Sequence, residues 1–131
     1  MPDDNVEIAK RALAAFNAED WELMESFYWP DAEAFAPEGW PEAEDAKGWE
    51  AIRRQYERLK DSWSEDHYEI ESLDAIDEDK VLSVGTWRIR GHGSGIEGEI
   101  KTWILTTLRD GKIARMQFFL DEEQAKRATG T

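Results

Sequence analysis

The hydrophobic pattern of this chain changes its period once, close to Trp63. Before that point, apolar residues recur at intervals of three and four, which is the period of an amphipathic helix. After it, apolar and polar residues alternate, which is the period of a strand with one buried face. The change predicts helices in the first half and a run of strands in the second, which is typical of an α+β fold.

Three helices are expected in the first half, over about residues 4–17, 21–29 and 49–63. Asp20 is the expected N-cap of the second helix, and Pro30 is expected to end it. A short strand over residues 32–36 is expected before the third helix. That helix has the clearest pattern, with 3-4-3-4 spacing of its apolar residues Trp49, Ile52, Tyr56, Leu59 and Trp63.

Four strands are expected in the second half, over residues 68–76, 81–90, 97–108 and 112–120. Asp110-Gly111 is typical of a two-residue hairpin turn, and strands joined by short turns form an antiparallel meander. Asp121 is the expected N-cap of a short C-terminal helix. We expect residues 1–131 to form one domain, since the chain shows no internal repeat and no linker.

The charge balance bears on possible partners. The formal net charge is −14, from 30 acidic and 16 basic residues, which argues against nucleic acid and anionic membrane surfaces as partners. The absence of cysteine excludes disulfides, thiolate catalysis and Cys-based metal sites. No apolar run approaches the roughly 20 residues of a membrane span, and the first residues do not resemble a signal peptide. A cytoplasmic location is therefore expected.

Several short strings follow one another along nearly the whole chain, namely Phe27-Tyr28-Trp29-Pro30-Asp31-Ala32, Pro37-Glu38-Gly39-Trp40, Gly48-Trp49-Glu50-Ala51-Ile52, and Leu108-Arg109-Asp110-Gly111-Lys112-Ile113 with Phe119-Leu120-Asp121. In this order they resemble the SnoaL-like branch of the nuclear-transport-factor-2-like superfamily. The resemblance implies three N-terminal helices packed on a curved antiparallel sheet, which form a cone with an internal pocket. It implies no single function, because the superfamily includes ketosteroid isomerases, polyketide cyclases, limonene epoxide hydrolases and transport factors.

The resemblance also indicates where a ketosteroid isomerase would carry its catalytic groups. The general base would stand just before Pro37, where this chain has Ala36, and the two oxyanion donors would stand at Ala12 and near Trp103. A methyl group or an indole cannot abstract a carbon-bound proton or replace a short O–H donor to an enolate. The isomerase mechanism of that family is therefore not expected here.

Two other activities of the superfamily can be compared in the same way. Many SnoaL-type cyclases carry Glu-His-Trp on the last strand, where this chain has Arg115-Met116-Gln117 and lacks the histidine. Epoxide hydrolases of this fold position a water with an Asp-Arg-Asp arrangement. Asp31, Arg88 and Asp121 supply these residue types, but no local motif links them.

Counting back from the Asp110-Gly111 turn predicts which strand residues share a face. Leu105 is expected opposite Met116, and Trp103 opposite Phe118. We expect this face to meet the helices and line the pocket, with packing of the core as the alternative role of each side chain. The predicted pocket residues are Tyr28, Trp40, Tyr56, Trp87, Lys101, Trp103, Met116, Phe118 and Leu120. A homodimer is expected through the outer face, which would carry Arg88, Arg90, Thr102, Ile104, Thr106, Arg115, Gln117 and Phe119.

The candidate catalytic residues are scattered along the chain. They are Asp121, Glu99, His92 and Tyr28, and the alternative role of Asp121 is to cap the C-terminal helix. Two separated histidines with scattered carboxylates do not form a recognisable metal site, and no cofactor is expected. The leading hypothesis is a domain that binds a hydrophobic small molecule. An enzyme (isomerase, cyclase or epoxide hydrolase) and a dimerisation module without catalysis are the alternatives.

Overall fold

The computed structural model of this protein describes residues 2–37, 45–93 and 97–129, which form four helices and six strands. The helices are α1 (Pro2–Ala18), α2 (Trp21–Glu25), α3 (Trp49–Asp61) and α4 (Glu122–Thr129). The strands are β1 (Tyr28–Phe35), β2 (Ala46–Lys47), β3 (Glu65–Asp77), β4 (Lys80–Arg90), β5 (Glu97–Arg109) and β6 (Lys112–Phe119).

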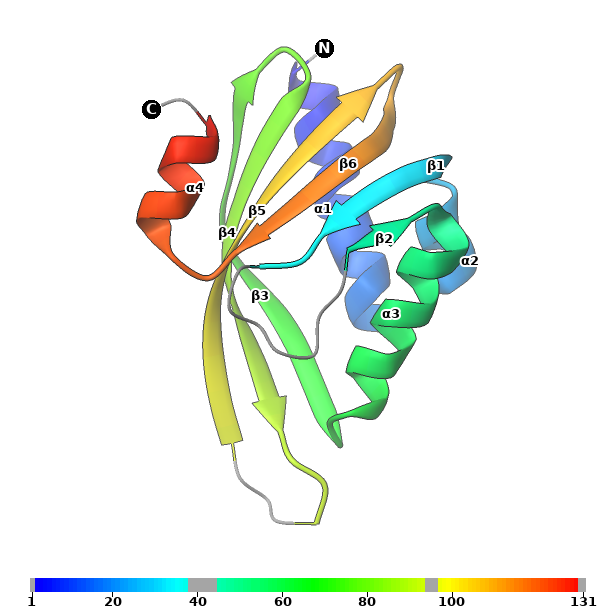
Figure 1. The fold of residues 1–131 in the computed structure, drawn as a ribbon, viewed down its shortest axis with the longest axis vertical. Helices are drawn as coiled ribbons and strands as arrows, with labels where there is room; N and C mark the ends of the chain where they lie inside the picture. The colour runs from blue at the N-terminus through cyan, green and yellow to red at the C-terminus, as the bar shows by residue number, and fades with distance from the viewer. Residues whose placement is uncertain (1, 38–44, 94–96, 130–131) are drawn as a thin grey trace.

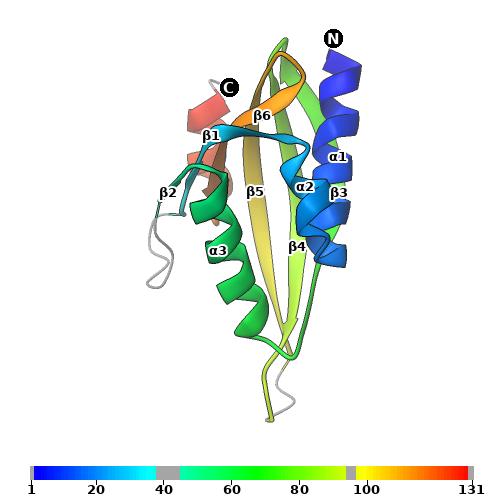
Figure 2. The same ribbon diagram turned by 90° about the vertical axis from the view of Figure 1, so that its right-hand side faces the viewer.

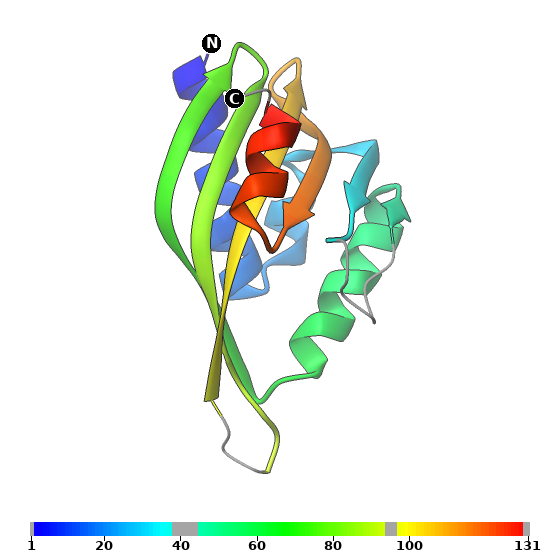
Figure 3. The same ribbon diagram turned by 60° about the vertical axis from the view of Figure 1, so that its left-hand side comes forward.

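The strands form one curved, unclosed sheet in the order β2-β1-β6-β5-β4-β3 (Figure 1). Helices α1, α2 and α3 lie on its concave face (Figure 2), whereas α4 lies on the opposite face against β5 and β6 (Figure 3). The predicted α+β architecture is thus confirmed. The sheet differs from the expectation in two pairings. Strand β1 runs parallel to β6, and the two-residue strand β2, which was not expected, pairs antiparallel with β1.

The second helix is shorter than expected. Its predicted N-cap is confirmed, since the Asp20 carboxylate accepts a hydrogen bond from the Leu23 amide at 3.2 Å. The helix ends at Glu25, and Tyr28 is already the first residue of β1. Pro30 lies within β1 rather than ending the helix, at a place where the pairing of β1 with β6 is irregular and no ladder hydrogen bond is required of it.

The third helix buries a lysine, Lys60, that is not part of its apolar 3-4-3-4 pattern. The Lys60 ammonium lies 3.1 Å from the Asp66 carboxylate, and these side chains are only 3% and 7% exposed. The same ammonium lies 4.2 Å from the centre of the Phe16 ring. An opposite charge and an aromatic face together make the burial of this ammonium tolerable.

The fourth helix begins as predicted. Asp121 is its N-cap, because one carboxylate oxygen accepts hydrogen bonds from the amides of Glu123 at 2.8 Å and Gln124 at 3.1 Å. These two amides would otherwise lack partners in the first turn.

The predicted register between β5 and β6 is wrong by one residue. Arg109 pairs with Lys112 as expected, but a bulge at Ala114 follows, so Thr106 rather than Leu105 lies opposite Met116. One extra residue in a strand turns every later side chain to the other face. Trp103 consequently lies opposite Phe119, on the convex face, and Ile104 lies opposite Phe118 on the concave face.

The concave face of β4 contains a glycine that the packing requires. The Tyr68 side chain extends from β3 across Gly85 and donates a hydrogen bond to the Thr102 carbonyl on β5 at 3.2 Å. A Cβ atom at Gly85 would lie 2.5 Å from the Glu69 carbonyl oxygen and 2.6 Å from the Tyr68 ring. Gly85 therefore leaves the space in which this ring lies flat against the sheet.

Substitution of this glycine tests that arrangement. We expect Gly85→Ala to lower the free energy of unfolding by about 1–3 kcal/mol, because backbone and ring must both move. The control is Gly98→Ala, whose added Cβ would meet, among the described residues, the Ile89 side chain at 3.4 Å. Urea denaturation of both variants measures the difference. Equal stability of the two variants would contradict this account of Gly85.

Candidate functional site

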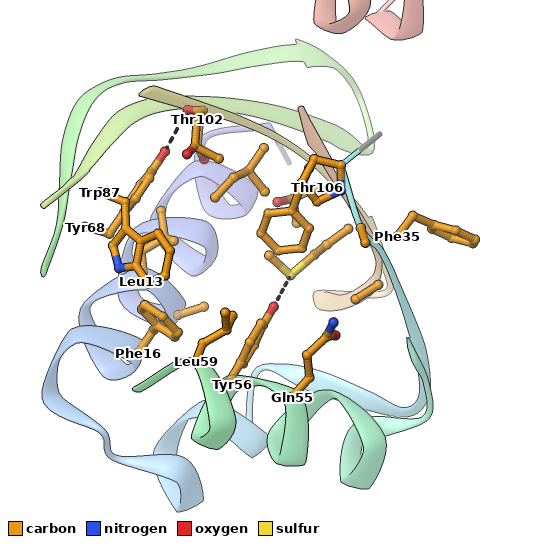
Figure 4. Close-up of a pocket in the computed structure, with 18 of the residues that line it drawn as sticks. Leu13, Phe16, Phe35, Gln55, Tyr56, Leu59, Tyr68, Trp87, Thr102 and Thr106 are labelled. Atoms are coloured by element: carbon orange, nitrogen blue, oxygen red, sulfur yellow. Dashed lines mark hydrogen bonds between the residues drawn. The ribbon is translucent and has the colours of Figure 1, made fainter. Parts of the chain in front are cut away.

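A cavity of about 130 Å³ lies between the concave face of the sheet and helices α1 and α3 (Figure 4). Its lining from the helical half of the chain consists of Ala9, Ala12, Leu13, Phe16, Met24, Tyr28, Ala34, Phe35, Ala36, Pro37, Gln55, Tyr56 and Leu59. Its lining from the remaining strands and the segment after them consists of Tyr68, Ser83, Trp87, Ile100, Thr102, Ile104, Thr106, Ile113, Met116, Phe118 and Leu120. None of these described residues is a carboxylate, a lysine, an arginine or a histidine.

One hydroxyl group in the lining has no partner. Ser83 is 1% exposed, and its Oγ forms no hydrogen bond with any described residue. It lies on the concave face of β4 opposite Ile104, two residues from Gly85. Such a group loses its hydration on folding without compensation, so a polar atom that enters the cavity can satisfy it.

Three tyrosine hydroxyls are distributed over the lining. Tyr28 and Tyr56 both donate to the sulfur of Met116, at 2.9 Å and 3.6 Å, and Tyr68 donates to the Thr102 carbonyl (Figure 4 draws the bonds of Tyr56 and Tyr68). Burial raises the pKa of each of the three phenols above its ordinary value. All three are therefore neutral donors at neutral pH.

The ion pair between Lys60 and Asp66 fixes two side chains of the cavity wall. The Trp87 indole N–H donates to the Asp66 carboxylate at 3.0 Å, and the Phe16 ring lies under the Lys60 ammonium. Trp87 also packs edge to face against Trp63, with 6.1 Å between ring centres. These contacts hold both aromatic rings in place around the cavity.

The structure brings together most of the predicted pocket residues. Tyr28, Tyr56, Trp87, Met116, Phe118 and Leu120 all line the cavity. Lys101 and Trp103 are not among the lining residues that the structure describes, since they alternate along β5 with the lining residues Thr102 and Ile104 and lie on the convex face. There Lys101 lies 3.6 Å from Glu71 and 5.6 Å from the centre of the Trp103 ring. Trp40 lies outside the described residues.

The candidate catalytic residues do not meet at one site. Only Tyr28 reaches the cavity. Asp121 caps α4, Glu99 pairs with Arg88 on the convex face, and the His92 ring lies 2.8 Å from the Asp61 carbonyl at the end of α3. The described residues also contain no cluster of three or more metal-binding side chains.

The alanines at two isomerase positions do border the cavity. Ala12 and Ala36 belong to the lining, whereas Trp103 does not belong to the described part of it. Sequence reasoning missed Thr102, Ile104 and Thr106, which it assigned to the outer face. Nothing in the local sequence marks Ala114 as a bulge, so no signal was available to correct their assignment.

The buried phenols predict how stability depends on pH. A tyrosine in the unfolded chain loses its proton near pH 10, whereas the three buried phenols hold theirs to a higher pH. Above about pH 10 the unfolded state therefore binds fewer protons, and the free energy of unfolding falls by up to about 1.4 kcal/mol per pH unit for each phenol.

This dependence is measured by urea denaturation between about pH 8 and pH 11. We expect Tyr56→Phe to lose less stability at alkaline pH than the wild type. The variant has one buried phenol fewer whose pKa is higher in the folded than in the unfolded state. Identical pH profiles of the two proteins would show that Tyr56 ionises as freely as an exposed tyrosine.

The chain matches a known protein family over most of its length. The SnoaL-like domain family matches residues 9–116 of this chain. No match is found among curated protein sequences. The described helices include none that is long and apolar enough to cross a membrane.

Solved structures with the same fold are numerous, and three illustrate the range. A protein from a soil-derived mobile gene cassette has a TM-score of 0.80 at 20% identity, covering 88% of each chain. TerC, co-crystallised with polyporic acid, has a TM-score of 0.79 at 21% identity, covering 98% of this chain and 99% of TerC. An NTF2-like protein from Burkholderia xenovorans has a TM-score of 0.76 at 24% identity, covering 97% of this chain and 96% of that protein. The matched residues span most of the described fold, and the chain belongs to the SnoaL-like domain family.

Proposed function

We propose that this domain binds a small, uncharged and largely apolar molecule in the cavity between α1, α3 and the sheet. The observation that carries the proposal is the character of the lining, which combines aliphatic and aromatic side chains with a few hydroxyl groups. Small-molecule sites in proteins have this composition, with few polar groups that fix orientation. The Ser83 hydroxyl supports the proposal, because a ligand atom would give it the partner that it lacks among the described residues.

The size of the cavity limits the ligand. An engineered apolar cavity of about 150 Å³ holds benzene, so a cavity of about 130 Å³ suits a molecule with one ring. The absence of charged side chains from the described lining limits the ligand further. An ionised ligand would lose its hydration in a space where the described residues offer no opposite charge.

The described residues favour binding over the catalytic alternatives. An isomerase, cyclase or epoxide hydrolase needs a group that takes or positions a proton, and the described lining has no carboxylate or imidazole. Its phenols have raised pKa values and are poor bases at neutral pH. Among proteins of this fold, TerC has been co-crystallised with the organic molecule polyporic acid.

Ligand titration tests the proposal with toluene as the probe and benzoate as its charged counterpart. We expect toluene to bind and to raise the melting temperature, whereas benzoate does neither. Nuclear magnetic resonance (NMR) titration gives both dissociation constants. The absence of toluene binding, or equal binding of both probes, would overturn the proposal.

A matched pair of variants ties this binding to the cavity. Ala12 lines the cavity at 3% exposure, whereas Ala14 lies on the exposed side of the same helix. Ala12→Leu should weaken toluene binding by about tenfold or more, because the added side chain occupies the ligand's space. Ala14→Leu should leave the affinity unchanged. Equal affinities in the two variants would place the toluene site elsewhere.

We also propose that the convex face of the sheet forms the homodimer predicted from the sequence. Trp103 and Phe119 lie opposite each other there, on neighbouring strands, and both remain partly exposed beside α4. Aromatic side chains of this kind are enriched at protein interfaces.

Sedimentation velocity tests this dimer. The wild type should sediment as a dimer and Trp103→Glu as a monomer, because the variant places a charge in the apolar contact. Leu23→Glu is the control, since Leu23 is a large exposed apolar residue on α2, on the other side of the molecule. A monomeric wild type, or dissociation by Leu23→Glu alone, would contradict the proposed interface.

A further inference from the structure

Two phenol groups converge on one sulfur atom inside the cavity. The Tyr28 hydroxyl donates to the Met116 sulfur at 2.9 Å, and the Tyr56 hydroxyl donates to the same sulfur at 3.6 Å. The three side chains come from β1, α3 and β6, and each residue is at most 5% exposed. Three elements that are distant in the sequence thus bring two donors to one point of the lining.

The acceptor at this point is a poor one. A thioether sulfur accepts hydrogen bonds only weakly, so two buried O–H donors gain little from it compared with an oxygen acceptor. Methionine is also flexible and adapts its position readily. An oxygen atom that entered the cavity could therefore take the place of the sulfur at small cost to the packing.

Burial keeps both phenol groups protonated, so that both can donate a hydrogen bond. It is the largest cause of the raised pKa of Tyr28 and of Tyr56, so both phenols retain their protons at neutral pH. The two hydroxyls also lie close enough to interact with each other. An acceptor placed between them can therefore receive two hydrogen bonds at one atom.

We propose that Tyr28 and Tyr56 form a two-donor site for the carbonyl oxygen of a small neutral ligand, such as a monocyclic ketone or aldehyde. The inference rests on the binding function proposed above and adds the chemical class of the ligand. A carbonyl oxygen offers two lone pairs and brings no donor of its own. An alcohol would bring an additional O–H that needs an acceptor of its own, and a carboxylate would bring a charge without a cation in the described lining.

Two probes of nearly the same shape test the site. Cyclohexanone carries a carbonyl group where methylenecyclohexane carries a carbon–carbon double bond. NMR titration of each probe gives the preference of the protein for the ketone as a ratio of dissociation constants. We expect Tyr56→Phe and Tyr28→Phe each to reduce this preference by about two- to tenfold, which is the usual net effect of one hydrogen bond.

A third tyrosine of the lining supplies the matched control. The Tyr68 hydroxyl already donates its hydrogen bond to the Thr102 carbonyl on the sheet. Tyr68→Phe removes the same atom from the same cavity, and it should leave the preference for the ketone unchanged. The carbonyl stretching frequency of bound cyclohexanone gives an independent readout. It should be lowered in the wild type and in Tyr68→Phe, and it should rise in Tyr56→Phe.

A further variant tests the site without removing either phenol. Met116→Leu keeps the volume and removes the competing sulfur, so it should increase the preference for the ketone. It serves as the test if Tyr28→Phe fails to fold. An unchanged preference in Met116→Leu would then overturn the site.

The outcomes separate this inference from the function on which it rests. If neither probe binds, both the proposed function and the carbonyl site are overturned. If both probes bind and no substitution of Tyr28 or Tyr56 changes their ratio, the cavity binds ligands but the two phenols do not select a carbonyl group.

Discussion

One extra residue in β6 determines which side chains enclose the cavity. At Ala114 two residues of β6 lie opposite one position of β5. Every later side chain of β6 therefore points to the opposite face of the sheet from the one it would have in a regular hairpin. As a result, Thr106 and Met116 lie together on the concave side, next to Ile104 and Phe118. The unpartnered hydroxyl of Ser83 and the sulfur of Met116 share one face because of this shift.

The remaining space comes from a mismatch of side-chain sizes between the layers. Helix α1 presents small residues to the sheet, among them Ala9 and Ala12, and β1 presents Ala34. The larger groups around them are held away from the centre. The Tyr68 ring lies against Gly85, and Trp87 is tied to Asp66. A cavity persists where neither layer can fill the gap without strain.

The order and type of the elements other than the two-residue strand β2 could be predicted from the sequence, because periodicity and capping are local. The change of period near Trp63, the caps at Asp20 and Asp121, and the Asp110-Gly111 turn all correspond to observed features. The parallel pairing of β1 with β6 could not be predicted, since it joins segments that are distant in the sequence.

The lining could be predicted only in part. Trp87 and Met116 lie on the concave face and line the cavity, on the side where the sequence alternation placed them. Trp103 was assigned to the wrong face. The alternation of polar and apolar residues does not show where a bulge occurs, because a bulge depends on backbone packing. Lys60 is not part of the apolar pattern of α3, and its burial depends on Asp66 and Phe16, which come from other elements.

The concave face, whose residues the bulge determines, encloses a space that should admit a neutral ligand. Nuclear Overhauser effects between benzene and the methyl groups of the protein test it directly. The account predicts contacts from benzene to the methyl groups of Ile104, Ile113 and Met116, which line the cavity. Contacts to Leu105, which the register turns to the convex face, or no contacts at all, would contradict it.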